Sequence, residues 1–521
     1  MKRIAFFLLA FFLVTFTAEL SAQEMTLDQI RRFRLRNSGA IVENNTLKGY
    51  YYFYMKEYND SKTNIYTVSL YDDNLNKALS FDIKKPNTAQ LLEVVYNSNT
   101  FMMIFYNKRE VEYETYDNTG KKTGTNIVEK VSIHEVERIN QSLANEEVDN
   151  ITTFPIGNTG FVRSNWEKKK KQGFDVEAMD NTAKRLWIYK SEEESDLLEF
   201  GDIMEVTEKF VAVSVLKKKS IMAKAFDTYF LVLDAKTGKK LMELPMRDKN
   251  DGELSLLNCF TDEEKEEITL VGEFYNPGDE VMKDKSLGLF IKIIGKTGTE
   301  VKYQKYAWAK EVLKLRKSTG DDEKDKTSLC FHRLFKTANG HLFAVAEEYR
   351  KTVSGVGVAM NILAAASGGS SDASNMQITI TDMVLIEFDE NLKMIAYNQI
   401  PKKKTRELLQ SGYGWYSASF LANVLKSYGA FDYSFTSTDK TTDQYEVIYT
   451  DFDRDKADGS RADKMIGVIS VKDGKTTTNR IPIDTEANRY SINPAKSGYL
   501  MVTEYFRKKK MLRSHLEKIE E

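Results

Sequence analysis

The sequence is poor in the residues that most catalytic and metal sites require. It has only four histidines and two cysteines among 521 residues. The histidines are His134, His332, His341 and His515. No two of them show the HExxH or paired Cys–His spacing that zinc sites use. The nucleophile elbow GxSxG and the phosphate loop GxxxxGK[ST] are also absent, so neither nucleophilic nor nucleotide-dependent catalysis has a motif.

Cysteine and proline are rare as well, and the net charge is small. Two cysteines, Cys259 and Cys330, are too few for a disulfide framework, and we expect buried free thiols, with one disulfide as the alternative. Seven prolines against 27 tyrosines and 29 phenylalanines favour β-strands. The 75 basic and 77 acidic residues nearly cancel, which argues against nucleic acid as a partner.

Only one long apolar run occurs, at the N-terminus. Lys2 and Arg3 precede IAFFLLAFFLV, and the small and polar stretch TFTAELSAQ follows. This order is typical of a secretory signal peptide, which we expect to span residues 1–22 and end at Ala22. No later segment is apolar enough to cross a bilayer. We therefore expect an exported chain, periplasmic or secreted, that is soluble after signal cleavage and not membrane-spanning.

The rest of the chain repeats one hairpin seven times. Each copy has an alternating apolar strand, a turn of Asp, Asn or Gly, usually a lysine, and a second strand. Asp and Asn suit such turns because they tolerate left-handed backbone and hydrogen-bond the chain just beyond. The turns begin at Asp72, Asp117, Asp180, Asp234, Gly295, Asp389 and Asp473.

A second pair of strands precedes each hairpin, as in residues 49–58 and 99–107. Four strands per repeat predict an all-β fold, a β-propeller of four-stranded blades. Residues 489–521 supply three strands, and residues 26–35 could supply the fourth, which would close the ring by pairing the two ends of the chain. This count gives eight blades, with seven as the alternative.

The predicted organisation is one propeller domain over residues 23–521, with insertions at 309–328, 352–376 and 401–429. The chain resembles β-propeller proteins in general and exported bacterial proteins of uncharacterised families. The Trp-Asp ending of WD repeats and the sialidase box are missing, so the resemblance implies a fold and no activity.

In an antiparallel blade, the turns between strands two and three lie at the opposite end from the hairpins described above. These turns are rich in lysine, and elaborated loops on a rigid scaffold are typical binding sites. The alternative is that each lysine run is a solvated turn. The predicted binding residues are Lys168, Lys169, Lys170, Lys171, Lys217, Lys218, Lys219, Lys508, Lys509, Lys510 and Trp415.

Two insertions at the same end are apolar. Residues 352–363 could form a short helix, and residues 415–428 have apolar residues at helical spacing. Together they could make an exposed patch for a partner or a membrane. The alternative is that they plug the ring or pack on each other. The patch would contain Val358, Ile362, Leu363, Trp415, Phe420 and Leu421.

Carboxylates offer two weaker candidates. Glu273 and Glu348 end second strands and could face the rim of the channel, as paired carboxylates do in glycosidases. The favoured alternative is repeat packing, with each Glu paired to nearby lysines. Asp451, Asp453 and Asp455 have alternating spacing that suits Ca²⁺, the one cofactor that the sequence suggests. The alternative is an acidic hairpin, because Lys456 stands where an EF-hand loop requires glycine.

These patterns favour an exported, non-enzymatic binding propeller that uses a basic loop face. Its partner would be a protein, a glycan or an anionic envelope surface. The alternative is a carbohydrate-active hydrolase or lyase with rim carboxylates.

Overall fold

A computed structural model describes residues 23–519, apart from 44–45, 145–151, 222, 224, 248–251, 316–327, 367–372, 411–412, 414–415, 428, 440–441, 454–462 and 488. The expected signal peptide at 1–22 therefore lies outside the described residues. The described strands form eight antiparallel sheets, seven of four strands and one of five. These are the blades of a β-propeller, which confirms the predicted all-β fold and the count of eight.

The chain divides into two compact units, residues 1–87 with 485–521 and residues 88–484. The smaller unit holds blades 1 and 8. In blade 8, β1 pairs with β33, Glu24 facing His515 and Leu27 facing Leu512. This confirms that the two ends of the chain pair, although the N-terminal strand begins at Glu24 and ends at Leu27, earlier than expected. The elements of this unit are β1 (Glu24–Leu27), η1 (Leu35–Asn37), β2 (Ser38–Glu43), β3 (Thr46–Tyr58), β4 (Thr63–Asp72), β5 (Lys77–Pro86), β31 (Arg489–Pro494), β32 (Tyr499–Phe506) and β33 (Met511–Lys518).

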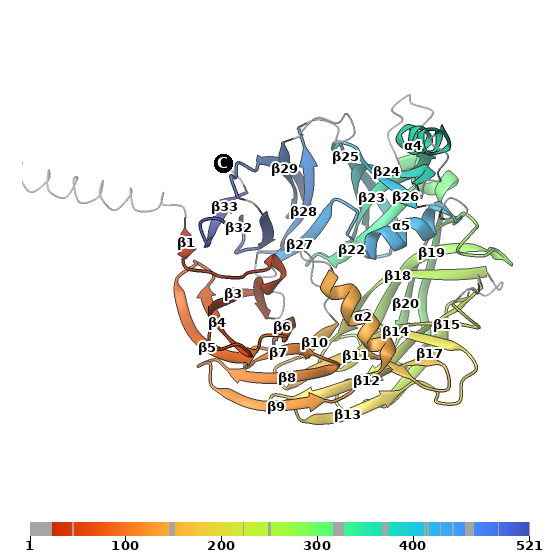
Figure 1. Ribbon diagram of the computed structural model, residues 1–521. Helices are drawn as coiled ribbons and strands as arrows, with labels where there is room; N and C mark the ends of the chain where they lie inside the picture. The colour runs from red at the N-terminus through yellow and green to blue at the C-terminus, as the bar shows by residue number, and fades with distance from the viewer. Residues whose placement is uncertain are drawn as a thin grey trace, which may run out of the picture. The chain divides into compact units, whose positions relative to one another are not determined.

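The larger unit holds blades 2 to 7 (Figure 1). Blades 2 to 4 are formed by β6 (Gln90–Tyr96), β7 (Thr100–Asn107), β8 (Glu110–Asp117), β9 (Lys122–Val128), β10 (Thr153–Ile156), β11 (Gly160–Lys168), β12 (Gln172–Asp180), β13 (Arg185–Lys190), β14 (Leu198–Val206), β15 (Phe210–Lys218), β16 (Asp227–Asp234) and β17 (Lys240–Pro245). Blades 5 to 7 are formed by β18 (Gly252–Asp262), β19 (Glu267–Pro277), β20 (Gly288–Gly295), β21 (Glu300–Ala307), β22 (Ser328–Lys336), β23 (Leu342–Val353), β24 (Ala373–Phe388), β25 (Met394–Ile400), β26 (Thr405–Gln410), β27 (Tyr433–Asp439), β28 (Gln444–Phe452), β29 (Lys464–Lys472) and β30 (Lys475–Pro482). The fifth strand of blade 6 is β26, which pairs with β24.

The aspartate hairpins join the third and fourth strands of their blades, as predicted. The Asp180 carboxylate accepts hydrogen bonds from the backbone N–H groups of Thr182 at 2.8 Å and Lys184 at 3.0 Å. Asp234 accepts one from the N–H of Thr237 at 2.8 Å. The repeated aspartates are therefore turn formers, because each satisfies backbone donors that the turn leaves unpaired.

Alternating apolar side chains of neighbouring blades form the core. One cluster joins blades 3 and 4 and includes Phe174, Val176, Val213 and Leu231, each at most 1% exposed. Burial of such a side chain stabilises the fold by about 1.5–3 kcal/mol. The blades therefore hold one another through side-chain packing between sheets.

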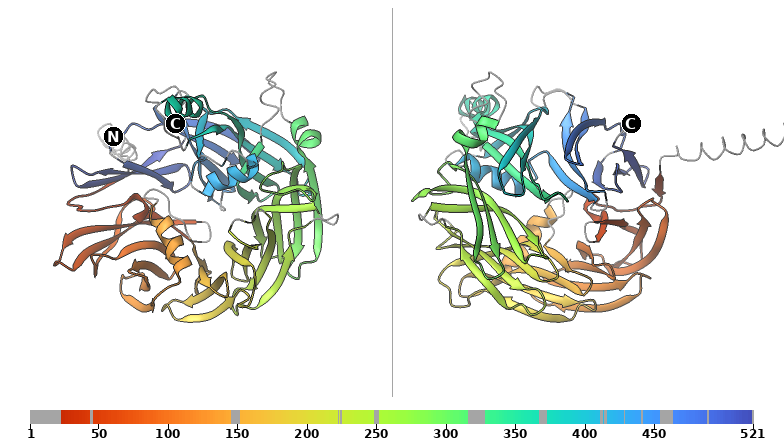
Figure 2. Two further views of the ribbon diagram at one scale, coloured as in Figure 1. Left: turned by 45° about the vertical axis from the view of Figure 1, so that its right-hand side comes forward. Right: turned by 180° about the vertical axis from the view of Figure 1, so that it is seen from behind.

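Helices occur in the connections. The helix α2 (Ile133–Ala144) contacts β6 and β11, α4 (Gly355–Ala366) contacts β24, and α5 (Ala418–Ser427) contacts β22 and β23 (Figures 1 and 2). A five-residue π-helix η2 (Trp308–Val312) and a single turn α3 (Leu313–Leu315) follow β21. None of the helices in the described part of the chain has the length and apolar character needed to cross a membrane.

Candidate functional site

The turns between the second and third strands of blades 3 and 4 carry seven of the predicted lysines. Lys168–Lys171 lie between β11 and β12, and Lys217–Lys219 lie at the end of β15. The Lys171 ammonium donates a hydrogen bond to the carbonyl oxygen of Lys219 at 3.2 Å. The structure therefore brings these two predicted basic turns together.

Some of these lysines are bound to carboxylates inside the fold. The Lys169 Nζ lies 2.9 Å from Asp175 Oδ1, and both side chains are 9% exposed. The Lys217 Nζ lies 3.1 Å from Glu243 and 3.8 Å from Glu199. Burial alone would lower the pKa of Lys217, but the hydrogen bond to Glu243 and the charge of Glu199 raise it. Lys169 and Lys217 therefore stabilise the blades and are not available to a partner.

The remaining lysines differ. Lys170 pairs with Asp196 at 3.0 Å at the surface. Lys168, Lys171, Lys218 and Lys219 have no carboxylate partner in the part of the chain that the structure describes. Lys218 is half-buried, and this desolvation lowers its pKa. A partly desolvated ammonium without a counter-ion is a place where an anion would be stabilised.

A cavity of about 380 Å³ opens beside Lys218. The turn between β19 and β20 also lines this cavity. So does Arg247, which is bound to Asp227 at 2.8 Å and Glu253 at 3.1 Å. The lining residues are Leu197, Lys217, Lys218, Lys219, Ala223, Ala225, Phe226, Asp227, Arg247, Glu253, Asp279, Glu280 and Val281. The lining thus combines four cations, four carboxylates and apolar side chains.

Contacts continue this row of turns into blades 5 and 6. Ser417 donates hydrogen bonds from its backbone to the carbonyl oxygen of Met282 at 2.7 Å, and from its hydroxyl to that of Val281 at 3.1 Å. The Lys351 ammonium donates to the carbonyl oxygen of Tyr416 at 2.9 Å. Each of these turns in blades 3 to 6 therefore contacts the next one directly or lines the same cavity.

The other predicted binding residues belong to the smaller unit or lie outside the described residues. Lys508, Lys509 and Lys510 belong to the smaller unit and are exposed in the turn between β32 and β33, where the Lys509 ammonium lies 5.1 Å from the centre of the Phe506 ring. Trp415 lies outside the described residues.

The two carboxylates considered for catalysis are both buried. Glu273 is 2% exposed and accepts a hydrogen bond from the Tyr275 hydroxyl at 3.0 Å. Burial raises the pKa of Glu273 to about 7. Glu348 is 1% exposed and accepts from the Tyr397 hydroxyl at 2.9 Å. Neither lines the cavity beside Lys218, so these contacts support a packing role.

Of the three calcium candidates, the structure describes Asp451 and Asp453. Asp451 is 1% exposed and accepts hydrogen bonds from the Lys403 N–H at 2.8 Å, with Arg480 Nε 2.7 Å away. Asp455 lies outside the described residues. Within the described ranges, no three His, Cys, Asp or Glu side chains are grouped so that they could hold a metal ion. Cys259 and Cys330 are buried free thiols, as expected, and burial raises the pKa of both.

The predicted apolar patch does not form as expected. Leu421 of α5 is 1% exposed and packs in a cluster with Tyr349 and Ile378 of blade 6. Leu363 of α4 is 72% exposed. The two helices contact different strands of blade 6. The helix α5 packs against β22 and β23, whereas α4 packs against β24. Among the patch residues whose side chains the structure describes, Leu363 is the exposed one.

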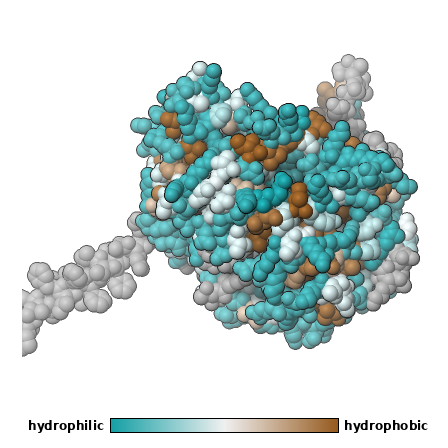
Figure 3. Space-filling model, turned by 90° about the horizontal axis from the view of Figure 1, so that it is seen from below, coloured by the Kyte–Doolittle hydropathy of each residue, from teal (hydrophilic) through white to brown (hydrophobic). Residues whose placement is uncertain are grey.

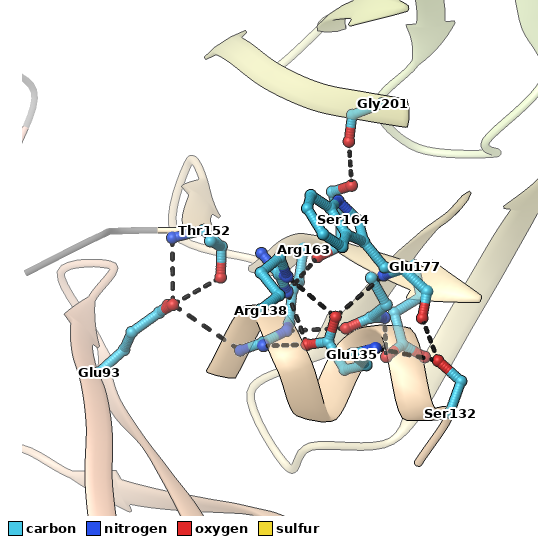
Figure 4. A network of polar contacts seen from close by, with 11 residues as sticks. Glu93, Ser132, Glu135, Arg138, Thr152, Arg163, Ser164, Glu177 and Gly201 are labelled. Carbon is cyan, nitrogen blue, oxygen red and sulfur yellow. Dashed lines mark hydrogen bonds and ion pairs between the residues drawn. The ribbon is translucent and has the colours of Figure 1, made fainter. Parts of the chain in front are cut away.

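Sequence patterns missed two buried ionic networks. In the first, Glu135 of α2 binds Arg138 and Arg163, and Glu93 lies 3.8 Å from Arg163 (Figure 4). In the second, the buried Lys402 ammonium lies 2.7 Å from Asp432 and 3.3 Å from Glu347, which also faces His332 at 3.2 Å. The apolar spacing of Val136, Ile139 and Leu143 could have revealed α2, but the pairings depend on contacts between distant strands.

Comparison with known families supplies one assignment. A family model of a family of unknown function, DUF6770, matches residues 1–520. The chain belongs to DUF6770. No curated protein matches the chain.

Solved structures resemble this DUF6770 chain only distantly. The WD40 domain of SCAP from fission yeast has 7% identity and a TM-score of 0.39 over 95% of this chain and 98% of that chain. A europium-containing methanol dehydrogenase has 10% identity and a TM-score of 0.39, over 92% and 84% of the two chains. Prolyl oligopeptidase B from Galerina marginata has 8% identity and a TM-score of 0.39, over 92% and 56%. At these TM-scores none of the three bears on the function of this chain.

Proposed function

We propose that this chain is an exported, non-enzymatic interaction module that binds a negatively charged partner through the lysine-rich turns of blades 3 and 4. The observation that carries the proposal is Lys218, which lines a cavity of about 380 Å³ without a carboxylate partner among the described residues. An anionic group in the cavity would replace the solvation that this ammonium has lost.

Three further lysines extend the site. Lys219 also lines the cavity, and Lys171, which binds the carbonyl oxygen of Lys219, and Lys168 add positive charge to the same pair of turns. One exposed ion pair contributes little, typically 0–1 kcal/mol. Several lysines facing one anionic surface act together, at about 1 kcal/mol each for an anionic membrane. Because screening acts over about 8 Å at physiological salt, we expect a strongly salt-dependent interaction.

A β-propeller in a family of unknown function is consistent with a binding role. Export is proposed from the charged start and apolar run of residues 1–22. The hydrolase or lyase alternative has less support, because Glu273 and Glu348 are buried and bonded to neighbouring side chains.

The test uses heparin, a sulfated polyanion, as the probe. The variant K168Q/K171Q/K218Q/K219Q removes four charges that have no carboxylate partner and leaves the Lys169 and Lys217 ion pairs in place. At about 1 kcal/mol per lysine, binding at low salt should weaken by up to about three orders of magnitude.

The matched control is K121Q/K184Q/K236Q/K393Q, which removes four exposed lysines from the hairpins at the other end of blades 2, 3, 4 and 6. It changes the net charge equally and should elute from heparin close to the unaltered chain. Equal elution of both variants would contradict a site at the lysine-rich turns.

A further inference from the structure

One connection of blade 6 extends the sheet into an arm. Between β23 and β24 the chain forms α4, and β24 is 16 residues long, whereas the third strand β16 of blade 4 has eight. The helix contacts β24, and the fifth strand β26 pairs with the same strand (Figure 1). We refer to β24, β26, α4 and the end of β23 as the arm.

Hydrogen bonds fix the helix to the arm. The Ser354 N–H donates to the carbonyl oxygen of Asn375 at 2.8 Å, and Asn361 Nδ2 donates to Asn375 Oδ1 at 2.8 Å. The orientation of α4 is therefore set by the strand beneath it. The side chains that α4 leaves exposed are presented by a defined structure.

The tip of the arm is apolar and uncharged. No charged residue occurs between Lys351 and Asp372. Val353 is 67% exposed, Leu363 is 72% exposed and Met360 is 47% exposed. On β26, Leu408 is 40% exposed and its neighbour in register is Gln377 of β24. Elsewhere, hydrophobic residues on the face shown in Figure 3 form small patches separated by hydrophilic ones.

Cations, tyrosines and one carboxylate, Glu407 of β26, lie just below this tip. Arg350, Thr379 and Arg406 face one another across β23, β24 and β26, three residues before Val353 in β23. At about 3.3 Å per residue, this row is about 10 Å from the tip. The Lys351 ammonium binds the backbone of Tyr416, whose ring is 5.9 Å from that of Tyr413, which is 39% exposed.

This layering matches the interface of a lipid bilayer. Interfacial segments bury an apolar face about 5–10 Å deep, at the boundary between headgroups and acyl chains. Their cations and amphipathic rings lie at the level of the headgroups. Protein interfaces instead concentrate aromatic residues at the centre and surround them with a polar rim. Here the centre is aliphatic and the tyrosines lie at the base.

We infer that the arm of blade 6 docks on an anionic lipid bilayer, with Val353, Met360 and Leu363 in the outer acyl region and Lys351, Arg406 and Tyr413 among the headgroups. The inference goes beyond the proposed function, because the arm and the lysine-rich turns share no residue and can be altered separately.

The test is flotation of the full chain with vesicles of equal parts phosphatidylcholine and phosphatidylglycerol. The variant M360E/L363E places two charges on exposed positions of the tip, so folding should be unaffected, as its circular dichroism and melting temperature should show. We expect at least tenfold weaker vesicle binding. The matched control I127E/L186E alters positions of the outer strands β9 and β13, which are 51% and 53% exposed, and should bind as the unaltered chain does.

A second measurement reports insertion directly. In L363C, an environment-sensitive dye at residue 363 should gain fluorescence when vesicles are added, while the same dye in L186C should not change. Failure of the unaltered chain to float, equal binding by M360E/L363E, or no change of the dye at residue 363 would overturn the inference. Heparin binding by M360E/L363E should be normal, which separates this result from a failure of the lysine-rich site.

Discussion

Replacement of Glu135 by glutamine should destabilise the attachment of α2 to blade 3. Glu135 is 2% exposed and accepts hydrogen bonds from Arg138 Nη2 at 2.6 Å, Arg163 Nη2 at 3.0 Å and the Trp166 N–H at 2.9 Å (Figure 4). Glutamine keeps the shape of the side chain and removes its charge. The change therefore isolates the electrostatic part of this contact.

The size of the effect follows from what remains around Arg163. Its side chain is 2% exposed, and its other carboxylate partner, Glu93, lies 3.8 Å away. Breaking a buried ion pair by removing one partner costs about 3–5 kcal/mol, because the other charge is left uncompensated. Since Glu93 remains, we expect the lower end of this range, about 3 kcal/mol.

The effect should depend on pH. Burial alone would raise the pKa of Glu135, but the guanidinium groups of Arg138 and Arg163 lower it below the ordinary range. A depressed folded-state pKa means that the stabilisation is present above the unfolded value of about 4.3 and is lost as the pH falls through the folded value. The difference between E135Q and the unaltered chain should therefore be full at pH 7 and shrink below about pH 4.

Hydrogen exchange of peptides that cover α2 is the appropriate assay, because it reports local opening in a chain too large for two-state unfolding. The matched control is E137Q, two residues along the same helix, where the side chain is exposed. A surface change of this kind should stay within about 0.5 kcal/mol. If E135Q and E137Q show the same exchange at pH 7, the buried network does not hold α2.

Two further predictions concern buried groups. Because the folded-state pKa of Glu273 is raised from 4.5 to about 7, the unaltered chain should lose stability as the pH rises from 5 to 8. Over this range the opening free energy of β19 in E273Q should rise by up to about 3 kcal/mol relative to the unaltered chain. A difference that does not change with pH would contradict the buried position of Glu273. Cys259 and Cys330 are 6% and 3% exposed, so a thiol reagent should label neither in the native chain and both after denaturation without reductant; no reactive thiols after denaturation would show a disulfide.

The propeller could be predicted from the sequence because its signals are local. Strand alternation and the Asp turn of each hairpin lie within a few residues, as at Asp180 and Asp234. The incomplete last blade predicts that the two chain ends pair. The pairing strand is Glu24–Leu27, whereas the sequence predicts it within residues 26–35. The residues of the turns and the number of strands per repeat are therefore sufficient to predict the fold.

The division of the lysines could not be predicted, because it depends on strand register and on neighbouring blades. Lys169 is neutralised by Asp175 across a tight turn, and Lys217 by Glu199 of the neighbouring strand β14 and by Glu243 of β17, two strands away. Lys218 points to a cavity that four separate connections create. A run of identical residues thus holds two kinds of side chain, those paired with carboxylates and those without a carboxylate partner among the described residues.

The central claim is that the lysine-rich turns of blades 3 and 4 bind a polyanion. Hydrogen exchange of the full chain with and without heparin at low salt tests this claim most directly. Heparin should slow exchange in peptides covering residues 168–171 and 217–220 and leave the hairpins at Asp117 and Asp180 unchanged. Protection confined to those hairpins, or no protection in either lysine-rich turn despite bound heparin, would contradict it.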